Sequence, residues 1–389
     1  MTRKDFRLDI KGYTDILQEI EVCRKYGEDY RLLKGRWMEY VDYIHPSLLE
    51  LKVADIIQET AKTQTLRLIA ASSHLPPFQA GQYINVLVNI DGVRTSRPYS
   101  ISSSPSQTAY YDITVGRTKE GFVSDYLLDK VKEGHILEAS SPTGTFYYNP
   151  LFHGNDLVFI AGGTGITPFM SMIREVTDKG IDRNIQLLYG SNTVEGAIFH
   201  DELIEKASKY NNFKYNLVIA DMSSDYTGLK GLIDAQLIEG NVNNIKGKTF
   251  YICGPRAMYE FCLPELEKLG IPKKRIRQEV FSQADKVTQL PGWPKNITTN
   301  HVFTVNIKGG RTAEQTITAQ AGEPLVIALE RNGIEVPTSC RSGACSLCRV
   351  KVLNGDVFES SNQVRKSDRD TGYIHACSAY PLSDLEVLL

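Results

Sequence analysis

The chain has 389 residues, enough for two or three domains with hydrophobic cores of ordinary size. Apolar residues make up 42% and charged residues 23%, which excludes collagen-like, disordered and low-complexity chains. Lysine plus arginine (44) nearly balances aspartate plus glutamate (46), so the chain lacks the basic excess of a nucleic-acid-binding protein. No apolar run approaches the ~20 residues of a membrane span, and the first residues lack a signal-peptide core. We expect a cytoplasmic protein that neither binds nucleic acid nor inserts into a membrane.

The pattern of residues 1–47 predicts a helical extension, which Pro46 would end. Apolar and aromatic residues recur there at helical spacing in two groups, Ile16, Leu17, Ile20 and Cys23, then Leu33, Trp37 and Tyr40. The segment is rich in tyrosine and arginine, which interfaces favour. We expect it to act in docking or dimerisation, or to cap the chain's own barrel.

Residues 48–152 change to a period of two. Alternating segments such as 49–60, 63–70 and 82–90 are separated by Pro, Gly and Ser, which predicts short antiparallel strands. Strands of this length and spacing are typical of a small β-barrel.

Residues 153–282 alternate buried strands with helices, which predicts an α/β domain built on a parallel sheet. Residues 283–299 contain prolines, glycine and no periodicity, so we interpret them as an interdomain linker. Residues 300–389 predict a hairpin, a helix, a cysteine-rich loop and a terminal strand.

Four of the seven cysteines lie in the last fifty residues of the chain. They are Cys340, Cys345, Cys348 and Cys377. Zinc sites usually pair cysteines at both ends of a motif, whereas the spacing C-x4-C-x2-C with a distant fourth cysteine is that of a plant-type 2Fe-2S site. The small residues at 342–344 would let backbone N–H groups approach the cluster sulfurs.

The cysteine loop and the downstream sequence GYIHACSAYPLSDLEV resemble a plant-type ferredoxin domain over about residues 299–389. The resemblance implies an α+β fold of the β-grasp type and a 2Fe-2S cluster bound by the four cysteines. Of the remaining cysteines, we expect Cys23 and Cys262 to be buried small hydrophobic residues.

Two motifs in the predicted barrel contain the residue types that a flavin nucleotide needs. Arg97-Pro98-Tyr99-Ser100 closes a strand, and Gly121-Phe122-Val123-Ser124 opens a helix. An arginine fork suits a phosphate, a tyrosine ring can stack on a flavin, and a serine can donate to a ring nitrogen. The N-terminus of a helix offers free N–H groups to a second phosphate.

Together these motifs resemble the flavin domain of the ferredoxin–NADP reductase superfamily. The resemblance implies FAD, with Arg97 and Ser124 on the pyrophosphate, Tyr99 stacked on the isoalloxazine ring and Ser100 near its N5 atom. FMN is the alternative, because the phthalate dioxygenase reductase type has the same domain order and uses FMN.

A glycine-rich loop follows the first buried strand of the α/β region. It reads Gly162-Gly163-Thr164-Gly165-Ile166-Thr167-Pro168 and precedes a helix, so its backbone can close on a pyrophosphate at the positive helix end. With Cys253-Gly254-Pro255 after a later strand, it resembles the nicotinamide domain of the same superfamily. That resemblance implies that Cys253 lies near the carbon that transfers hydride. Phe281 is either a core residue or the aromatic that in relatives covers the flavin face.

The order of the three domains implies a reductase that converts a two-electron donor into single electrons, because a flavin accepts a hydride and a 2Fe-2S cluster accepts one electron at a time. The resemblance extends to reductase components of two-component oxygenases, of the phenylacetyl-CoA epoxidase and phthalate dioxygenase types. We expect NADH rather than NADPH as donor, since no basic residue follows the strand at residues 185–192.

The expected partner is a separate electron-acceptor protein, an oxygenase, a demethylase or another redox partner. The alternatives are an electron-transfer or redox-sensing subunit of a larger complex, and a reductase for a non-oxygenase acceptor such as a hybrid-cluster or corrinoid protein. The sequence leaves the oligomeric state open.

Overall fold

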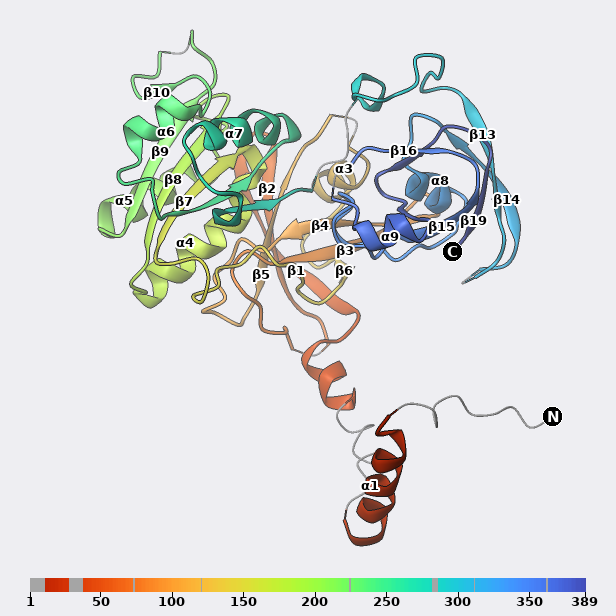
Figure 1. Cartoon of the computed structure of the whole chain (residues 1–389). Helices are drawn as coiled ribbons and strands as arrows, with labels where there is room; N and C mark the ends of the chain where they lie inside the picture. The colour runs from red at the N-terminus through yellow and green to blue at the C-terminus, as the bar shows by residue number, and fades with distance from the viewer. Residues whose placement is uncertain are drawn as a thin grey trace, which may run out of the picture. The chain divides into compact units, whose positions relative to one another are not determined.

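The computed structural model describes residues 11–27, 38–72, 74–119, 121–223, 225–281, 286–310, 312–361 and 363–389. The chain divides into two units, residues 1–47 and residues 48–389 (Figure 1). Within the described ranges, no helix has both the length and the apolar character needed to cross a membrane. The predictions for Leu33 and Trp37 and for residues 282–285 lie outside the described residues.

The first unit contains helix α1 (Tyr13–Tyr26) and a further helical segment at residues 38–44. The predicted helical extension is therefore present. No residue of α1 is buried, and Ile16 and Val22 are each 53% exposed. Cys23 is exposed as well, so the prediction that it is buried is wrong: no residue of α1 is buried by any part of the chain that the structure describes.

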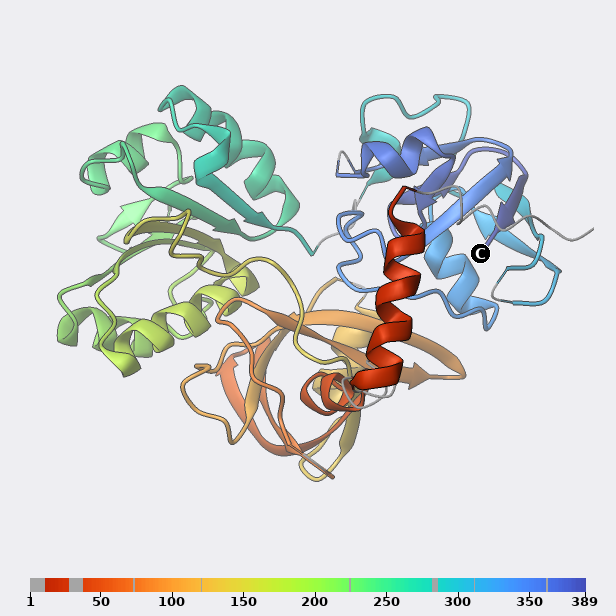
Figure 2. The ribbon, with the colours of Figure 1, turned by 60° about the horizontal axis from the view of Figure 1, so that its bottom comes forward.

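The second unit begins with an antiparallel sheet, which confirms the predicted barrel. Its elements are β1 (Leu49–Thr60), β2 (Thr63–Ala70), β3 (Tyr83–Ile90), β4 (Val93–Ser100), β5 (Tyr111–Gly116), helix α3 (Phe122–Asp129) and β6 (Ile136–Ala139). The strand order is β4-β3-β6-β1-β2-β5, and a bridge between Ile101 and Ile113 joins the end of β4 to β5. The strands therefore curl around an apolar core, as the orange segments of Figure 2 show.

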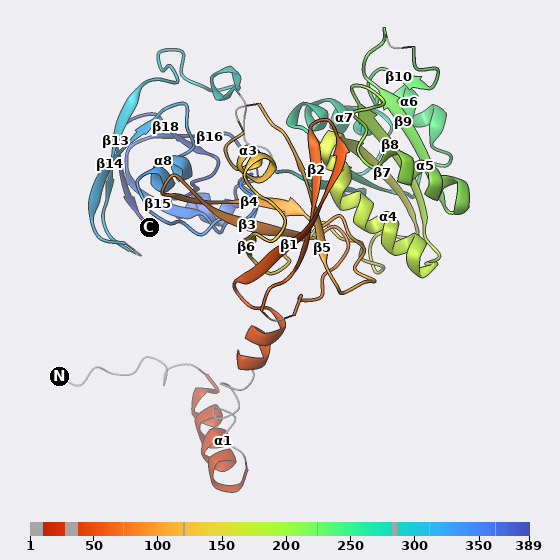
Figure 3. The same ribbon diagram turned by 180° about the vertical axis from the view of Figure 1, so that it is seen from behind.

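A parallel sheet follows, which confirms the predicted α/β domain. Its elements are β7 (Asp156–Gly162), the 3-10 turn η2 (Gly163–Ile166), α4 (Thr167–Lys179), β8 (Asn184–Ser191), α5 (His200–Lys209), β9 (Phe213–Ile219), β10 (Leu229–Lys230), α6 (Ala235–Asn241), β11 (Thr249–Cys253), α7 (Arg256–Lys268), η3 (Lys273–Arg275) and β12 (Ile276–Glu279). Helices α4 and α5 pack against one face and α6 and α7 against the other (Figure 3).

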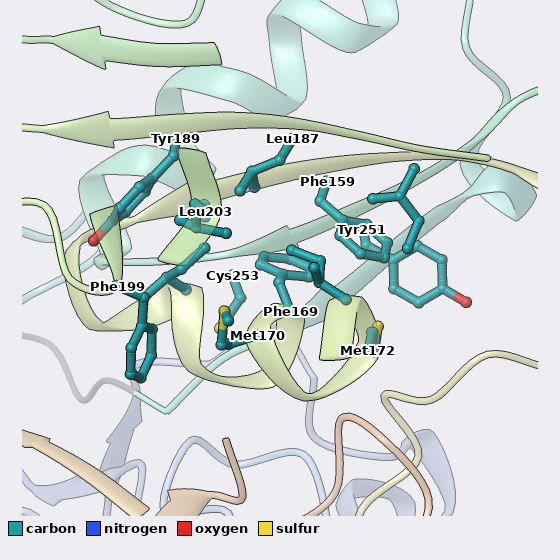
Figure 4. Close-up of a cluster of buried hydrophobic side chains, with 14 of the residues drawn as sticks. Phe159, Phe169, Met170, Met172, Leu187, Tyr189, Phe199, Leu203, Tyr251 and Cys253 are labelled. Atoms are coloured by element: carbon teal, nitrogen blue, oxygen red, sulfur yellow. The ribbon is translucent and has the colours of Figure 1, made fainter. Parts of the chain in front are cut away.

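The strand order of this sheet is β10-β9-β8-β7-β11-β12. Successive strands are added toward one edge from β7 to β10 and toward the other edge from β11, so the switch point lies between β7 and β11. Ala161 and Cys253 face each other in the register of these two strands. In open parallel sheets, ligands bind at the carboxyl ends of the strands at such a switch point. Figure 4 shows Cys253 at the border of the aromatic core, close to Phe169 and Met170.

The C-terminal part of the unit is an α+β domain that matches the expected β-grasp arrangement. Its elements are β13 (Val302–Ile307), β14 (Gln315–Gln320), α8 (Leu325–Arg331), β15 (Arg349–Asn354), β16 (Val357–Glu359), α9 (Lys366–Asp370), β17 (Tyr373–His375), β18 (Ala379–Pro381) and β19 (Leu385–Leu388). The predicted hairpin is β13–β14, and the terminal strand β19 inserts between β13 and β15, parallel to β13.

The segment interpreted as a linker packs against this domain where it is described. It contains the turn η4 (Val287–Gln289), and both Val287 and Trp293 are buried beside Tyr380. The Trp293 ring meets Phe358 edge to face, with 5.2 Å between ring centroids. Residues 286–299 therefore contribute to the core of the ferredoxin-like domain instead of acting as a free tether.

Candidate functional site

The flavin motif of the sequence lies on strand β4 and at the residue that ends it. Arg97, Pro98 and Tyr99 are half-buried, and Ser100 is buried. Arg97 Nη1 donates to Thr95 Oγ1 at 2.8 Å and to the Ser96 carbonyl oxygen at 2.8 Å. Burial, and then the nearby Arg341 guanidinium, lower the pKa of Arg97 to about 10. The hydrogen bonds of Arg97 within the described residues go to neutral oxygens, so this half-buried cation fits a phosphate group.

The second flavin motif begins helix α3, which contacts strands β3 and β5. Gly121 lies close to two hydroxyl groups: a Cβ there would lie 2.1 Å from Ser124 Oγ and 2.6 Å from Thr118 Oγ1, so both side chains would have to rotate away. Phe122 is 45% exposed, whereas Val123 is buried in the barrel core. Within this motif, the Ser124 hydroxyl and the backbone N–H groups are the parts that can meet a phosphate.

The glycine-rich loop of the α/β domain forms η2 and the start of α4, where Thr167 and Pro168 are buried. A Cβ at Gly165 would lie 2.1 Å from the carbonyl oxygen of Cys253, so the loop and the turn after β11 are in direct contact. The Thr164 methyl group meets Gly116, the last residue of β5 in the barrel. The predicted nicotinamide loop therefore reaches both the switch point and the flavin domain.

The turn Cys253-Gly254-Pro255 is held in place by α7. Tyr259 accepts a hydrogen bond from the Gly254 N–H at 3.0 Å and donates one to the carbonyl oxygen of Glu279. Burial raises the pKa of the Cys253 thiol well above its usual range. Cys253 is therefore a neutral thiol in a dry position beside the switch point.

Phe281 follows β12 of the α/β domain, and its side chain packs against the flavin barrel. Its ring meets Tyr83 of the barrel edge to face, with 5.3 Å between centroids. The Tyr83 hydroxyl shares a 2.8 Å hydrogen bond with Ser339, which immediately precedes Cys340. Nearby, burial and then the Cys340 sulfur raise the pKa of Glu279 to about 8, and its Oε2 atom is buried without a hydrogen-bond partner among the described residues. The nicotinamide, flavin and cysteine motifs thus meet at one place.

Three of the four predicted cluster cysteines lie on the loop at residues 340–348, and a hydrogen bond from Gly343 connects this loop to the fourth, Cys377. Cys340, Cys348 and Cys377 are buried, and Cys345 is half-buried. The N–H of Gly343 donates to Cys377 Sγ at 3.2 Å, and the N–H of Cys345 donates to Cys340 Sγ at 3.3 Å. Hydrogen bonds from the Cys345 and Cys377 thiols lower the pKa of Cys340. Four soft sulfur donors, two of which already accept backbone N–H bonds, fit a 2Fe-2S cluster.

A buried histidine, His375, connects the cysteine loop to Asp368 through hydrogen bonds. His375 Nδ1 contacts the Gly343 carbonyl oxygen at 2.5 Å, and Nε2 contacts Asp368 Oδ2 at 2.9 Å. The bond to His375 lowers the pKa of Asp368, which Arg349 also contacts. Sequence reasoning missed this support, because residues 368 and 375 lie outside the cysteine spacing that defines the motif.

Family models match all three domains of the second unit. The oxidoreductase FAD-binding domain matches residues 49–148, the oxidoreductase NAD-binding domain residues 159–263, and the 2Fe-2S iron-sulfur cluster binding domain residues 306–382. These three matches confirm the resemblance to the ferredoxin–NADP reductase superfamily with a C-terminal ferredoxin domain. The match of the FAD-binding model favours FAD over the FMN alternative for this ferredoxin reductase.

Curated relatives align with most of the reductase chain. It is 27% identical to the glycine betaine monooxygenase reductase subunit of Pseudomonas aeruginosa, over 87% of this chain and 94% of that protein. It is 29% identical to NADH oxidoreductase HCR of Escherichia coli, over 86% and 96%. It is 27% identical to one of the subunits of the 1,2-phenylacetyl-CoA epoxidase of Escherichia coli, over 86% and 95%.

A solved phthalate dioxygenase reductase has the same fold, with a TM-score of 0.67 and 24% identity, covering 88% of this chain and 97% of that one. Together with the family matches, these relatives make the chain an oxidoreductase of the ferredoxin reductase type with FAD, NAD and 2Fe-2S domains.

Proposed function

We propose that this chain takes hydride from NADH on FAD and passes single electrons through its 2Fe-2S cluster to an oxygenase or demethylase component. The observation that carries the proposal is the meeting of three motifs. Thr164 of the nicotinamide loop abuts the end of β5, and Ser339 of the cysteine loop is bonded to Tyr83 of β3. Electron donor, flavin and cluster would therefore be adjacent within one chain.

When bound, FAD supplies the conversion of a two-electron donor into single electrons. The chain's own residues would bind and orient the FAD and exclude water from it. Arg97 and Ser124 would hold the pyrophosphate, and Tyr99 and Ser100 would contact the flavin ring. Arg97, Tyr99 and Ser100 lie on strand β4 and Ser124 lies in the first turn of α3, so regular secondary structure would position all four side chains for transfer.

On the nicotinamide side, residues 162–168 would bind the coenzyme pyrophosphate through backbone N–H groups. Cys253 would pack near the transferring carbon as a neutral thiol, with Gly254 and Pro255 keeping the backbone clear. Phe281 and its edge contact with Tyr83 would exclude water from the place of transfer.

The choice of acceptor rests on the relatives. Two of the three curated relatives described above are parts of a monooxygenase and of an epoxidase, which supports an oxygenase component as the partner. The third is named only as an NADH oxidoreductase, which supports NADH as donor and favours, as a second candidate, an acceptor that is not an oxygenase.

Steady-state assays of the isolated, FAD-loaded and cluster-loaded chain test the proposal. NADH should reduce ferricyanide, which accepts electrons from the flavin, and also cytochrome c, which depends on the cluster. A protein with a vestigial nicotinamide site would oxidise no NADH in either assay. Reduction of ferricyanide without any reduction of the cluster by NADH would also contradict the proposed path.

We expect kcat/KM to be at least about tenfold higher for NADH than for NADPH, because binding a 2′-phosphate usually needs an arginine or lysine near the end of β8. No lysine or arginine occurs between Asn184 and Glu205. Arg183 lies at the opposite end of β8, where its guanidinium stacks 3.4 Å from the centroid of Tyr148. Glu195 is exposed in the loop that follows the strand.

A cavity of about 610 Å³ beside this loop supports the same preference. Its two arginines already bind carboxylates, Arg67 with Asp112 at 2.9 Å and Arg174 with Glu202. Side-by-side kinetics with the two coenzymes give the answer, and a clear preference for NADPH would contradict the prediction.

Deletion of residues 1–45 should leave NADH–ferricyanide turnover within about twofold of the full chain, since every motif proposed for hydride transfer lies in residues 48–389. Under the docking interpretation, reduction of the natural partner should fall instead. If the shortened chain no longer accumulates as flavin-loaded protein, the segment is a cap on the fold and the docking interpretation is wrong.

A further inference from the structure

The ferredoxin domain is joined to the flavin barrel by a buried polar contact centred on strand β4. Ser96 Oγ and Thr338 Oγ1 share a 3.0 Å hydrogen bond, and Asn85 Nδ2 donates to Ser339 Oγ at 3.1 Å. Residues 338 and 339 lead directly into Cys340, the first cluster cysteine. The contact therefore connects the cluster loop with the strand that carries the flavin motif.

Thr95 is the centre of this contact, because its hydroxyl uses its full hydrogen-bonding capacity there. It donates to Glu330 Oε2 of α8 at 2.9 Å. It accepts from Arg341 Nη2 at 3.1 Å and from Arg97 Nη1 at 2.8 Å. A threonine hydroxyl has one proton to donate and two lone pairs, so all three are engaged. One side chain thus bonds α8, the cluster loop and the flavin-motif arginine.

Arg341 and Glu330 complete the contact from the ferredoxin side. Arg341 Nη1 donates to Glu330 Oε2 at 3.2 Å, Nη2 bonds Oε1, and both side chains are at least 93% buried. Arg341 also has a φ of 52°, a conformation that residues with a side chain rarely adopt. A strained residue persists when its surroundings over-determine it, and here the ion pair and Thr95 do so.

We propose that Thr95, Glu330 and Arg341 form a positioning lock that fixes the cluster loop against the flavin strand, so that electrons reach the cluster within the same chain. The inference rests on the proposed function. NADH would give one hydride to the flavin and become NAD⁺; the two electrons would then leave one at a time through the cluster to the acceptor, and the proton would be released to solvent. The lock contacts neither NADH, the cluster nor the acceptor. It sets the fraction of molecules in which the cluster loop lies where the cluster can receive an electron from the flavin.

The main test compares Thr95→Val with Thr95→Ser in the FAD-loaded and cluster-loaded chain. Valine keeps the shape and removes all three bonds, whereas serine retains the hydroxyl. After mixing with NADH, flavin bleaching is followed by absorbance and cluster reduction by freeze-quench electron paramagnetic resonance. We expect cluster reduction to be at least about tenfold slower in the valine variant, because even one of its three lost charge-assisted bonds is worth that much, and close to the original rate in the serine variant.

Thr114→Val is the matched control. Thr114 is a buried threonine of the same barrel, but its hydroxyl bonds Thr65 and Ser102, away from the ferredoxin domain. Glu330→Gln tests the lock from the other side, should Thr95→Val fold poorly. Rates are normalised to the FAD and cluster content of each variant. This is necessary because Arg97, which would hold the FAD pyrophosphate, also bonds the Thr95 hydroxyl.

Hydrogen exchange supplies a readout that does not depend on turnover. The amides of residues 338–341 should exchange faster in Thr95→Val and Glu330→Gln than in Thr114→Val and in the original chain. A merely structural role would lower cluster content yet leave the rate per remaining cluster unchanged, and that result overturns the lock, as does a serine variant that is as slow as valine. If the original chain shows no flavin reduction by NADH, the proposed function fails instead.

Discussion

Replacing Cys345 by serine should abolish the reduction of cytochrome c while NADH–ferricyanide turnover stays within about twofold of the original. Cys345 supplies one of the four predicted cluster thiols. Its backbone N–H also donates a hydrogen bond to the sulfur of a second, Cys340. A serine oxygen is a poor ligand at a site built from soft sulfur, so the cluster should be lost or destabilised. The flavin and nicotinamide motifs belong to separate hydrophobic cores and should remain loaded.

The measurement is the ratio of the two activities together with the absorbance of flavin and cluster. Cys23→Ser is the matched control, because Cys23 is an exposed thiol on α1 outside the cluster set. Loss of flavin reduction by NADH in Cys345→Ser would show that electron flow does not follow the proposed domain order.

Gly165→Ala should slow the reduction of flavin by NADH about a hundredfold, the scale of effect that a 1 Å misplacement of a reactant can have. A Cβ at this position would lie 2.1 Å from the Cys253 carbonyl oxygen and 2.4 Å from its carbonyl carbon. Both atoms belong to the backbone, so no rotation of a side chain relieves the overlap. The loop and the Cys253 turn must then separate, and the proposed nicotinamide site is distorted.

Gly190→Ala is the control for this variant. Gly190 lies on β8 of the same sheet, where a Cβ would find its nearest neighbour at 3.6 Å, an ordinary contact distance. In Gly165→Ala, flavin reduced by dithionite should still pass electrons to the cluster. A variant with the original rate of flavin reduction by NADH would refute the role proposed for residues 162–168.

The cysteine spacing and the glycine-rich loop could be interpreted from the sequence because each is a local pattern. Four thiols at fixed intervals limit the cluster type, and a glycine run between a strand and a helix indicates a phosphate site wherever it occurs. The change from period two to alternating strands and helices likewise marks the barrel and the parallel sheet. These features need only neighbouring residues, so the order of the three domains followed from them.

Burial of isolated side chains was less predictable. Cys23 has helical spacing but lies on a helix with no buried residue, because a repeating pattern does not say whether a partner is present. The segment at 286–299 lacks periodicity and still buries Trp293, because an irregular chain can pack an aromatic ring without forming a regular element. In both cases the local pattern was interpreted correctly and the environment was not.

The lock between the ferredoxin domain and the flavin strand could come only from the tertiary structure. Thr95 and Glu330 are 235 residues apart, and Tyr83 and Ser339 are 256 apart, so no spacing rule connects them. The sequence by itself determined which chemical groups the chain carries and in which domain each lies. The fold decided which of those groups meet, because docking two domains pairs side chains by shape and hydrogen-bonding capacity, independently of their distance along the chain.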